Sequence, residues 1–79
     1  MTWMFEVYYL PPFDAAREER VAGVVARHGG RLDFREAPEV DGSSNVCLTY
    51  EFAELASAEA AAGELKAAGD YIEGPYQYT

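Results

Sequence analysis

Residues 3–10 (WMFEVYYL) are rich in aromatic and branched residues and predict a strand. Apolar and polar residues alternate with a period of two in two further stretches, 31–36 (RLDFRE) and 46–52 (VCLTYEF). Such alternation is typical of strands that bury one face of a sheet. The run DYIEG, from Asp70 to Gly74, predicts a fourth and shorter strand. Pro11-Pro12 ends the first strand, because proline has no backbone N–H to donate to a ladder.

Between these strands, the apolar residues follow the spacing of α-helices. Asp14 is the expected N-cap of a first helix, which Gly29-Gly30 ends. This helix carries an apolar stripe at i, i+3, i+4 and i+7, made by Val21, Val24, Val25 and His28. Ser57 is the expected N-cap of a second helix, which ends at Gly69. Its stripe consists of Ala58, Ala61, Ala62, Leu65 and Ala68.

The predicted order is strand, helix, strand, strand, helix, strand, in a single domain over residues 1–79. Strand–helix–strand connections are right-handed, and two helices are too few to cover both faces of a four-stranded sheet. The order therefore predicts an α+β fold of the ferredoxin-like type, a βαββαβ sandwich. In this fold both helices lie on one face of an antiparallel sheet.

The alternation also assigns side chains to the two faces of the sheet. The face packed on the helices is expected to form one core with Val7, Val24, Phe34, Leu48, Tyr50 and Leu65. The open face is expected to carry Met4, Glu6, Tyr8, Leu10, Arg31, Asp33, Arg35, Cys47, Thr49 and Glu51. Arg31 and Arg35 can pair with Glu51 across the ladder. Met4, Tyr8 and Leu10 are too apolar for a simple solvated face, so we expect something to cover them.

The end of the chain is aromatic, although chain ends are commonly polar and frayed. Gly74-Pro75 is expected to break the last strand and leave residues 75–79 as a tail. Such a tail can lay its tyrosines on the apolar part of the open face, in the same chain or on a second copy. The candidate binding residues are therefore Met4, Glu6, Tyr8, Leu10, Tyr76 and Tyr78.

The net charge of the chain argues against some classes of partner. The chain has 14 acidic and 6 basic residues, a formal net charge of −8, which repels phosphate backbones and anionic lipid. We therefore expect neither nucleic acid nor a membrane as a partner. One cysteine excludes an internal disulfide. The start MTWMFEVYYL has no basic leader, which predicts a cytoplasmic protein. Five arginines against one lysine indicate a GC-rich bacterial genome.

Two families of small domains share this order of elements. FEVYYLP resembles the first-strand motif of the RNA-recognition motif in ending with Leu-Pro. NVCLTYEF resembles its third-strand motif in ending with an aromatic residue before an alanine-rich helix. That family stacks bases on open-face aromatic residues, but the corresponding positions here are Glu6, Cys47 and Thr49, which cannot stack on a base. ACT-type ligand-sensing domains are similar only in strand order.

Little in the sequence suggests catalysis. His28 lies in the last turn of a helix, where a structural role is expected, and Cys47 has no flanking basic residue to activate it. We predict no catalytic residue, metal site or cofactor. The leading hypothesis is a non-catalytic domain that forms a homodimer or binds a small protein through its open face. The alternative is a dimeric ferredoxin-like domain that binds a small molecule or acts as an enzyme. Its pocket would be lined by Tyr8 and Glu6, with Tyr71 or Tyr76, and a tyrosine and a carboxylate could do acid–base work there.

Overall fold

The computed structural model describes residues 1–37 and 45–79, which form four strands and two helices. In chain order the elements are β1 (Trp3–Tyr9), α1 (Ala15–Arg27), β2 (Arg31–Glu36), β3 (Val46–Phe52), α2 (Leu55–Ala67) and β4 (Tyr71–Gln77). The order is the predicted one. Most of the predicted loop from Pro38 to Asn45 lies outside the described residues, which resume at Asn45.

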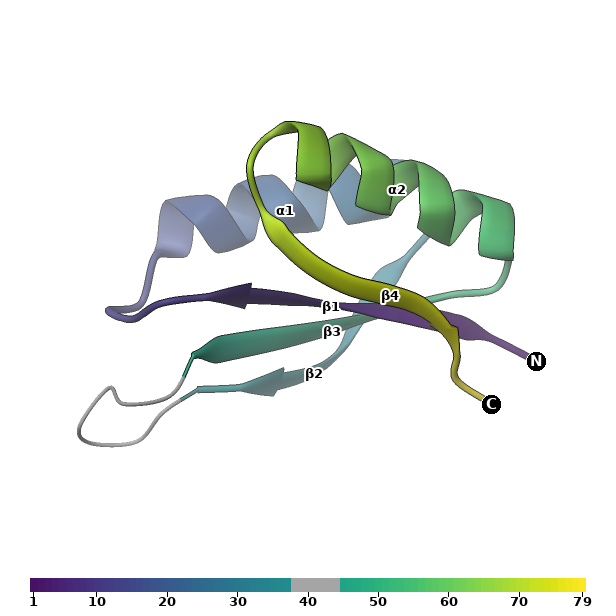
Figure 1. The fold of residues 1–79 in the computed structure, drawn as a ribbon, viewed down its shortest axis with the longest axis horizontal. Coiled ribbons are helices and arrows are strands. Elements are labelled where there is room, and N and C mark those ends of the chain that lie inside the picture. Colours follow the sequence, from purple (N-terminus) through teal and green to yellow (C-terminus); the bar gives the residue numbers. More distant parts are fainter. Residues whose placement is uncertain (38–44) are drawn as a thin grey trace.

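The strands form one sheet in the order β2-β3-β1-β4, and all neighbouring strands are antiparallel. Both helices lie on the same side of this sheet (Figure 1). Helix α2 packs on β1 and β4, whereas α1 lies over β2. The chain therefore has the predicted ferredoxin-like α+β fold, and neither helix covers the second face of the sheet.

The core lies between the helices and the two central strands. It consists of Phe5, Val7, Tyr9, Val21, Val24, Val25, Val46, Leu48, Tyr50, Phe52, Ala58, Ala61, Ala62 and Leu65. The alternation in β1 and β3 predicted the right faces, since the buried apolar residues of both strands point toward the helices. The alanines of α2 keep this helix close to the sheet.

A bulge in β2 makes the predicted core position of Phe34 wrong. Leu32 pairs with Tyr50 and Phe34 pairs with Thr49, so that Asp33 is an extra residue between two ladder positions. Thr49 lies on the open face, and Phe34 therefore lies there too. Its side chain is 57% exposed.

The same bulge makes the predicted open-face position of Arg35 wrong. It turns the side chain toward the helices, where the guanidinium donates two hydrogen bonds of 2.8 and 2.9 Å to Glu18 of α1. These bonds hold the pKa of Glu18 below its usual range. Arg31, on the other side of the bulge, pairs with Glu51 at 2.5 Å as predicted.

A second bulge, at Gly74-Pro75, makes the predicted end of the last strand wrong. The ladder to β1 resumes after it, with Tyr76 opposite Met4. Gly74 has a φ of +115°, and a Cβ added there would lie 3.0 Å from the carbonyl oxygen of Met4. Glycine permits this close approach, so the chain bulges and continues as a strand to Gln77.

One of the two predicted helix N-caps is correct. Asp14 caps α1 as predicted, because its carboxylate accepts the backbone N–H of Arg17 at 3.0 Å. Helix α2 begins at Leu55, with Glu54 in the extended N-cap position, so Ser57 lies inside the first turn and is not the cap. Glu54 makes no capping bond with its side chain.

Both helices end alike, in glycines with a left-handed backbone. Gly29 and Gly69 have φ angles of 81° and 97°. Directly after the second glycine, the buried Asp70 accepts hydrogen bonds of 2.8 and 2.9 Å from Arg20 of α1. This bidentate pair ties the start of β4 to the first helix.

Candidate functional site

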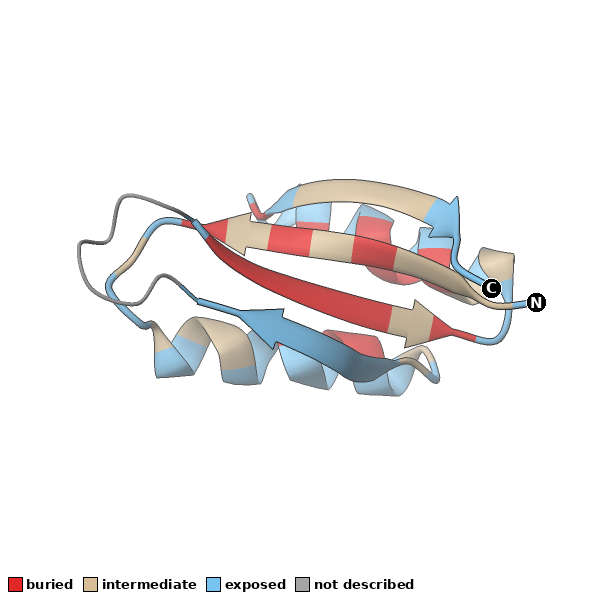
Figure 2. Ribbon diagram, turned by 90° about the horizontal axis from the view of Figure 1, so that it is seen from below, coloured by how far each residue is buried: buried red, intermediate tan, exposed pale blue. Residues whose placement is uncertain are grey.

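The open face presents three rows of side chains, each crossing the strands in the order β4-β1-β3-β2. The first row is Tyr76, Met4, Glu51 and Arg31. The second row is Glu73, Glu6, Thr49 and Phe34. The third row is Tyr71, Tyr8, Cys47 and Glu36. Figure 2 shows this side of the molecule, with β3 buried along most of its length and β2 exposed.

Exposed aromatic residues gather on the outer strands of this face. Phe34, Tyr71, Tyr76 and Tyr78 are between 39% and 61% exposed. Both bulges contribute, because each shifts the alternation by one residue and turns the aromatic side chains that follow onto the open face. The exposed aromatic side chains therefore lie along the two edges of the open face, on strands that are not neighbours.

The centre of the face is polar, and its groups bond one another. Glu6 accepts hydrogen bonds from the hydroxyl of Tyr8 at 3.0 Å and from the thiol of Cys47 at 3.5 Å. Burial raises the pKa of Tyr8, and the bond to Glu6 raises it further. Burial also raises the pKa of Cys47, so both groups stay protonated at neutral pH and act as donors. The predicted pair of Tyr8 and Glu6 is thus present as a hydrogen-bonded pair.

A hollow of about 490 Å³ lies at one end of the face. Its lining consists of Tyr8, Tyr9, Leu10, Asn45, Tyr71 and Glu73. The rings of Tyr8 and Tyr71 meet edge to face, with centroids 5.9 Å apart and planes at 75°. The hydroxyl of Tyr71 donates to Glu73 at 3.1 Å, which raises the pKa of Tyr71.

The end of the chain is held against its own sheet. The N–H of Tyr78 donates to the carbonyl of Thr2 at 2.8 Å, and the N–H of Thr2 donates to the carbonyl of Thr79 at 3.2 Å. The hydroxyl of Tyr78 donates to Asp33 at 2.5 Å. Residues 75–79 are therefore held within their own chain, as the sequence allowed, but as a paired continuation of β4 and not as a tail redirected by a strand break.

Five of the six predicted binding residues fall at two ends of the open face. Met4, Tyr76 and Tyr78 lie at the end where the termini meet, whereas Tyr8 and the 77% exposed Leu10 lie at the other. Glu6 lies between them. Sequence reasoning missed Phe34, which the Asp33 bulge hid, and Glu73. The one signal that pointed to Glu73 was its spacing: it follows Tyr71 by two residues, so the two side chains share a face of the fourth strand.

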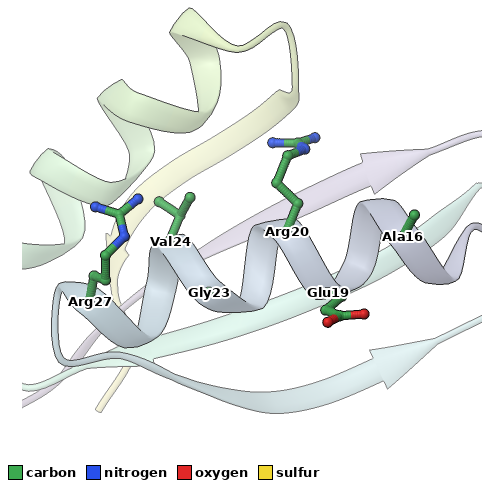
Figure 3. Close-up of a pocket in the computed structure, with 6 residues that line it drawn as sticks. All are labelled: Ala16, Glu19, Arg20, Gly23, Val24 and Arg27. Atoms are coloured by element: carbon green, nitrogen blue, oxygen red, sulfur yellow. The ribbon is translucent and has the colours of Figure 1, made fainter.

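A larger hollow of about 610 Å³ lies in the helix layer, beside α1 (Figure 3). Arg20, Val24 and Arg27 project from one side of this helix toward α2 (Figure 3). Arg20 already pairs with Asp70, and Arg27 pairs with Glu64. Since both cations are neutralised within the chain, this hollow offers less to a ligand than the one on the open face.

The remaining chemistry is structural. His28 is the C-cap residue of α1, and its Nε2 lies 3.1 Å from Glu64 of α2, so the ring joins the two helices. In residues 1–37 and 45–79, no three His, Cys, Asp or Glu side chains lie close enough to hold a metal ion. Neither α1 nor α2, the helices of the described part of the chain, is long and apolar enough to cross a membrane.

No protein-family model and no curated protein matches the chain. The crystal structure of protein Atu4242 from Agrobacterium tumefaciens is similar, with a TM-score of 0.49 and 14% sequence identity. The alignment covers 100% of this chain and 97% of that protein. A likeness of this degree supports no inference about activity.

Proposed function

We propose that the protein is a non-catalytic domain that forms a homodimer, with the open face of one chain packed on the open face of a second. The exposed aromatic side chains of Phe34, Tyr71, Tyr76 and Tyr78 carry this proposal. A single exposed apolar residue is ordinary, but four exposed aromatic side chains on one face of so small a sheet favour an interaction site. Tyrosine suits such a site, because its ring is buried while its hydroxyl keeps a polar partner.

The two edge strands of the sheet are poorly suited to pair with a second copy, which leaves the open face as the contact surface. The bulge at Asp33 interrupts edge strand β2, and the bulge at Gly74-Pro75 interrupts edge strand β4. Pro75 also lacks a backbone N–H. Bulges and proline are the features that keep edge strands from pairing with those of another molecule. A second copy therefore has its best contact on the face.

The shape and the charge of the chain favour a weak dimer. The Cα atoms span 36 × 25 × 15 Å, and the strands lie side by side along the shortest of these axes (Figures 1 and 2). So narrow a face is expected to bury an area near the lower limit of stable interfaces, about 1,200 Å² for both partners. Two copies of net charge −8 also repel each other, so salt should strengthen the dimer by screening.

Sedimentation velocity over a range of protein concentrations tests the proposal. We expect wild-type protein to dimerise and Phe34→Ser to shift toward monomer. The melting temperature of this variant should barely change, because the ring is more than half exposed. The matched control is Phe13→Ser, since Phe13 is 64% exposed but stacks on Arg35 on the helix side. A wild-type protein that stays monomeric, or a Phe34→Ser variant that dimerises like wild type, would overturn the proposal.

The hollow beside Tyr8, Tyr71 and Glu73 supports a second candidate function, the binding of a small molecule. Its size lies within the range of about 300–1,000 Å³ that is typical of ligand sites. A native mass spectrum of purified protein tests this candidate. A small mass that stays with the folded chain and is lost on denaturation would support it. For either candidate function, we further propose a cytoplasmic location in a bacterium, on the basis of the sequence features given above.

A further inference from the structure

We propose that the hollow at the end of the open face is a site for an organic cation, namely an ammonium or guanidinium group on a short alkyl chain. The inference deepens the second candidate function, because it names the class of ligand. It depends on the walls of the hollow, on two adjacent carboxylates and on where the chain's own cations lie.

Two of the residues that line the hollow, Tyr8 and Tyr71, have their rings in contact. Tyr8 and Tyr71 stand at 75° to each other, so they form a corner and not a flat stack. The face of an aromatic ring attracts a cation when the charge lies within about 6 Å of its centre. Leu10, which also lines the hollow, provides apolar surface for an alkyl chain.

The second observation is a pair of carboxylates with no cationic partner among residues 1–37 and 45–79. Glu6 and Glu73 are direct cross-strand partners on this face. Their bonds come from neutral donors, since Tyr71 donates to Glu73, whereas Tyr8 and Cys47 donate to Glu6. Like charges opposite each other destabilise a strand pair. A bound cation beside Glu73 would relieve this repulsion.

The chain does not provide that cation itself. In the part of the chain that the structure describes, six residues line the hollow and none of them is basic. The arginines pair elsewhere: Arg17 and Arg20 with Asp70, Arg27 with Glu64, Arg31 with Glu51 and Arg35 with Glu18. An anionic ligand would be repelled by the two carboxylates, and a neutral one would leave them unbalanced. The chemistry of the hollow therefore favours a positive ligand.

The test is a titration of ¹⁵N-labelled full-length protein, followed by NMR, with n-butylamine, n-butylguanidine and neutral n-butanol. We expect saturable shifts at Asn45, Tyr71 and Glu73 with both cations, and binding of n-butanol at least about tenfold weaker. Glu73→Gln should weaken cation binding by about tenfold or more, as expected when a hydrogen bond to a charged group is lost. Glu59→Gln is the matched control, because it removes the same charge from an exposed position on α2.

The outcomes separate this inference from the functions proposed above. Equal binding of n-butanol and n-butylamine would overturn the cation class but keep a small-molecule site. Absence of saturable binding with every probe would overturn both the cation class and the small-molecule site. Magnesium chloride at matched ionic strength should not displace n-butylamine, and displacement would reduce the effect to general attraction by an acidic surface. Phe34→Ser should bind the cations at least as tightly as wild type, because Phe34 does not line the hollow.

Discussion

The hydroxyl of Tyr78 donates a 2.5 Å hydrogen bond to Asp33, although the two residues belong to opposite edges of the sheet. Asp33 is the bulge residue of β2, and Tyr78 reaches the open face because the bulge in β4 shifts the alternation behind it. The side chain therefore joins the two irregular strands across the two regular ones between them.

Removal of residues 75–79 should destabilise the fold. Truncation after Gly74 removes the last ladder positions of β4 and the backbone bonds between Thr2 and the chain end. Each lost backbone bond is worth about 0.5–1.5 kcal/mol, so we expect a total loss of roughly 2 kcal/mol or more. The melting temperature should fall by about 8 °C or more. Tyr78→Phe removes only the bond to Asp33 and should lower the melting temperature far less. A truncated chain that equals full-length protein in mass and melting temperature would show that the end is passive.

Two apolar positions that were both expected in the core should respond very differently to alanine. Leu48 is 1% exposed, so Leu48→Ala should lower the unfolding free energy by about 2–5 kcal/mol. Phe34 lies on the open face, so Phe34→Ala should lower it by less than about 1 kcal/mol. Urea unfolding of both variants at a low protein concentration measures the difference. Similar losses at the two positions would contradict the bulge at Asp33.

The second bulge can be tested at its glycine. Gly74→Ala places a Cβ 3.0 Å from a backbone oxygen at a positive φ, so we expect a loss of about 1–3 kcal/mol. Gly63→Ala is the control, because Gly63 lies in α2 with no atom within 4 Å of an added Cβ. Alanine there should raise the unfolding free energy by about 0.5–1 kcal/mol. Urea unfolding measures both changes in the unfolding free energy. A Gly74→Ala variant as stable as wild type would count against the bulge.

Stability should fall in alkaline solution. Burial raises the pKa of Tyr50 to about 12, and the pKa in the unfolded chain is about 10. A raised folded pKa means that the contribution is complete below pH 10 and is lost as pH rises from about 10 through 12. For Tyr50 it amounts to roughly 2–3 kcal/mol. Urea midpoints at pH 8, 10 and 11 should show this decline, and Tyr50→Phe should make it shallower. A midpoint that is level up to pH 11 would mean that Tyr50 ionises as freely in the fold as in the unfolded chain.

The protein should not bind nucleic acid. Its net charge is −8, and the open-face positions where a recognition motif stacks bases hold Glu6 and the buried Cys47 and Thr49. Titration into labelled single-stranded RNA and DNA at low salt is the most sensitive measurement, because phosphate contacts are strongest there. Saturable micromolar binding would contradict the charge argument.

The predictability of this fold differs between its inner and outer strands. Strands β1 and β3 are covered by helices on one face, so their apolar residues must alternate, and the sequence showed both faces correctly. Strand β2 alternates just as strictly in sequence, yet Phe34 and Arg35 lie on faces opposite to those expected. An edge strand buries little on either face. The hydrophobic pattern therefore cannot exclude one extra residue in its ladder.

The candidate site could be predicted only in part for the same reason. Met4, Glu6 and Tyr8 follow from the alternation in β1, and their place on the open face was predicted. The contacts between Tyr71 and Tyr8 and between Tyr78 and Asp33 depend on the register of the outer strands. Glycine and proline at 74–75 signalled an irregularity, but they fit a bulge as well as a strand end. Pairing with β1 decides between the two.

Both ends of the chain leave the molecule at one corner, where the hydroxyls of Thr2 and Thr79 lie 2.8 Å apart (Figure 1). A bridging peptide of a few residues could close the backbone into a ring without moving a strand. Such a cyclic chain should resist exopeptidases and fray less than the linear one. The same closeness means that an affinity tag on either end sits beside Tyr76 and Tyr78. A cleavable tag, removed before any mass measurement, is therefore the sound choice for work on this surface.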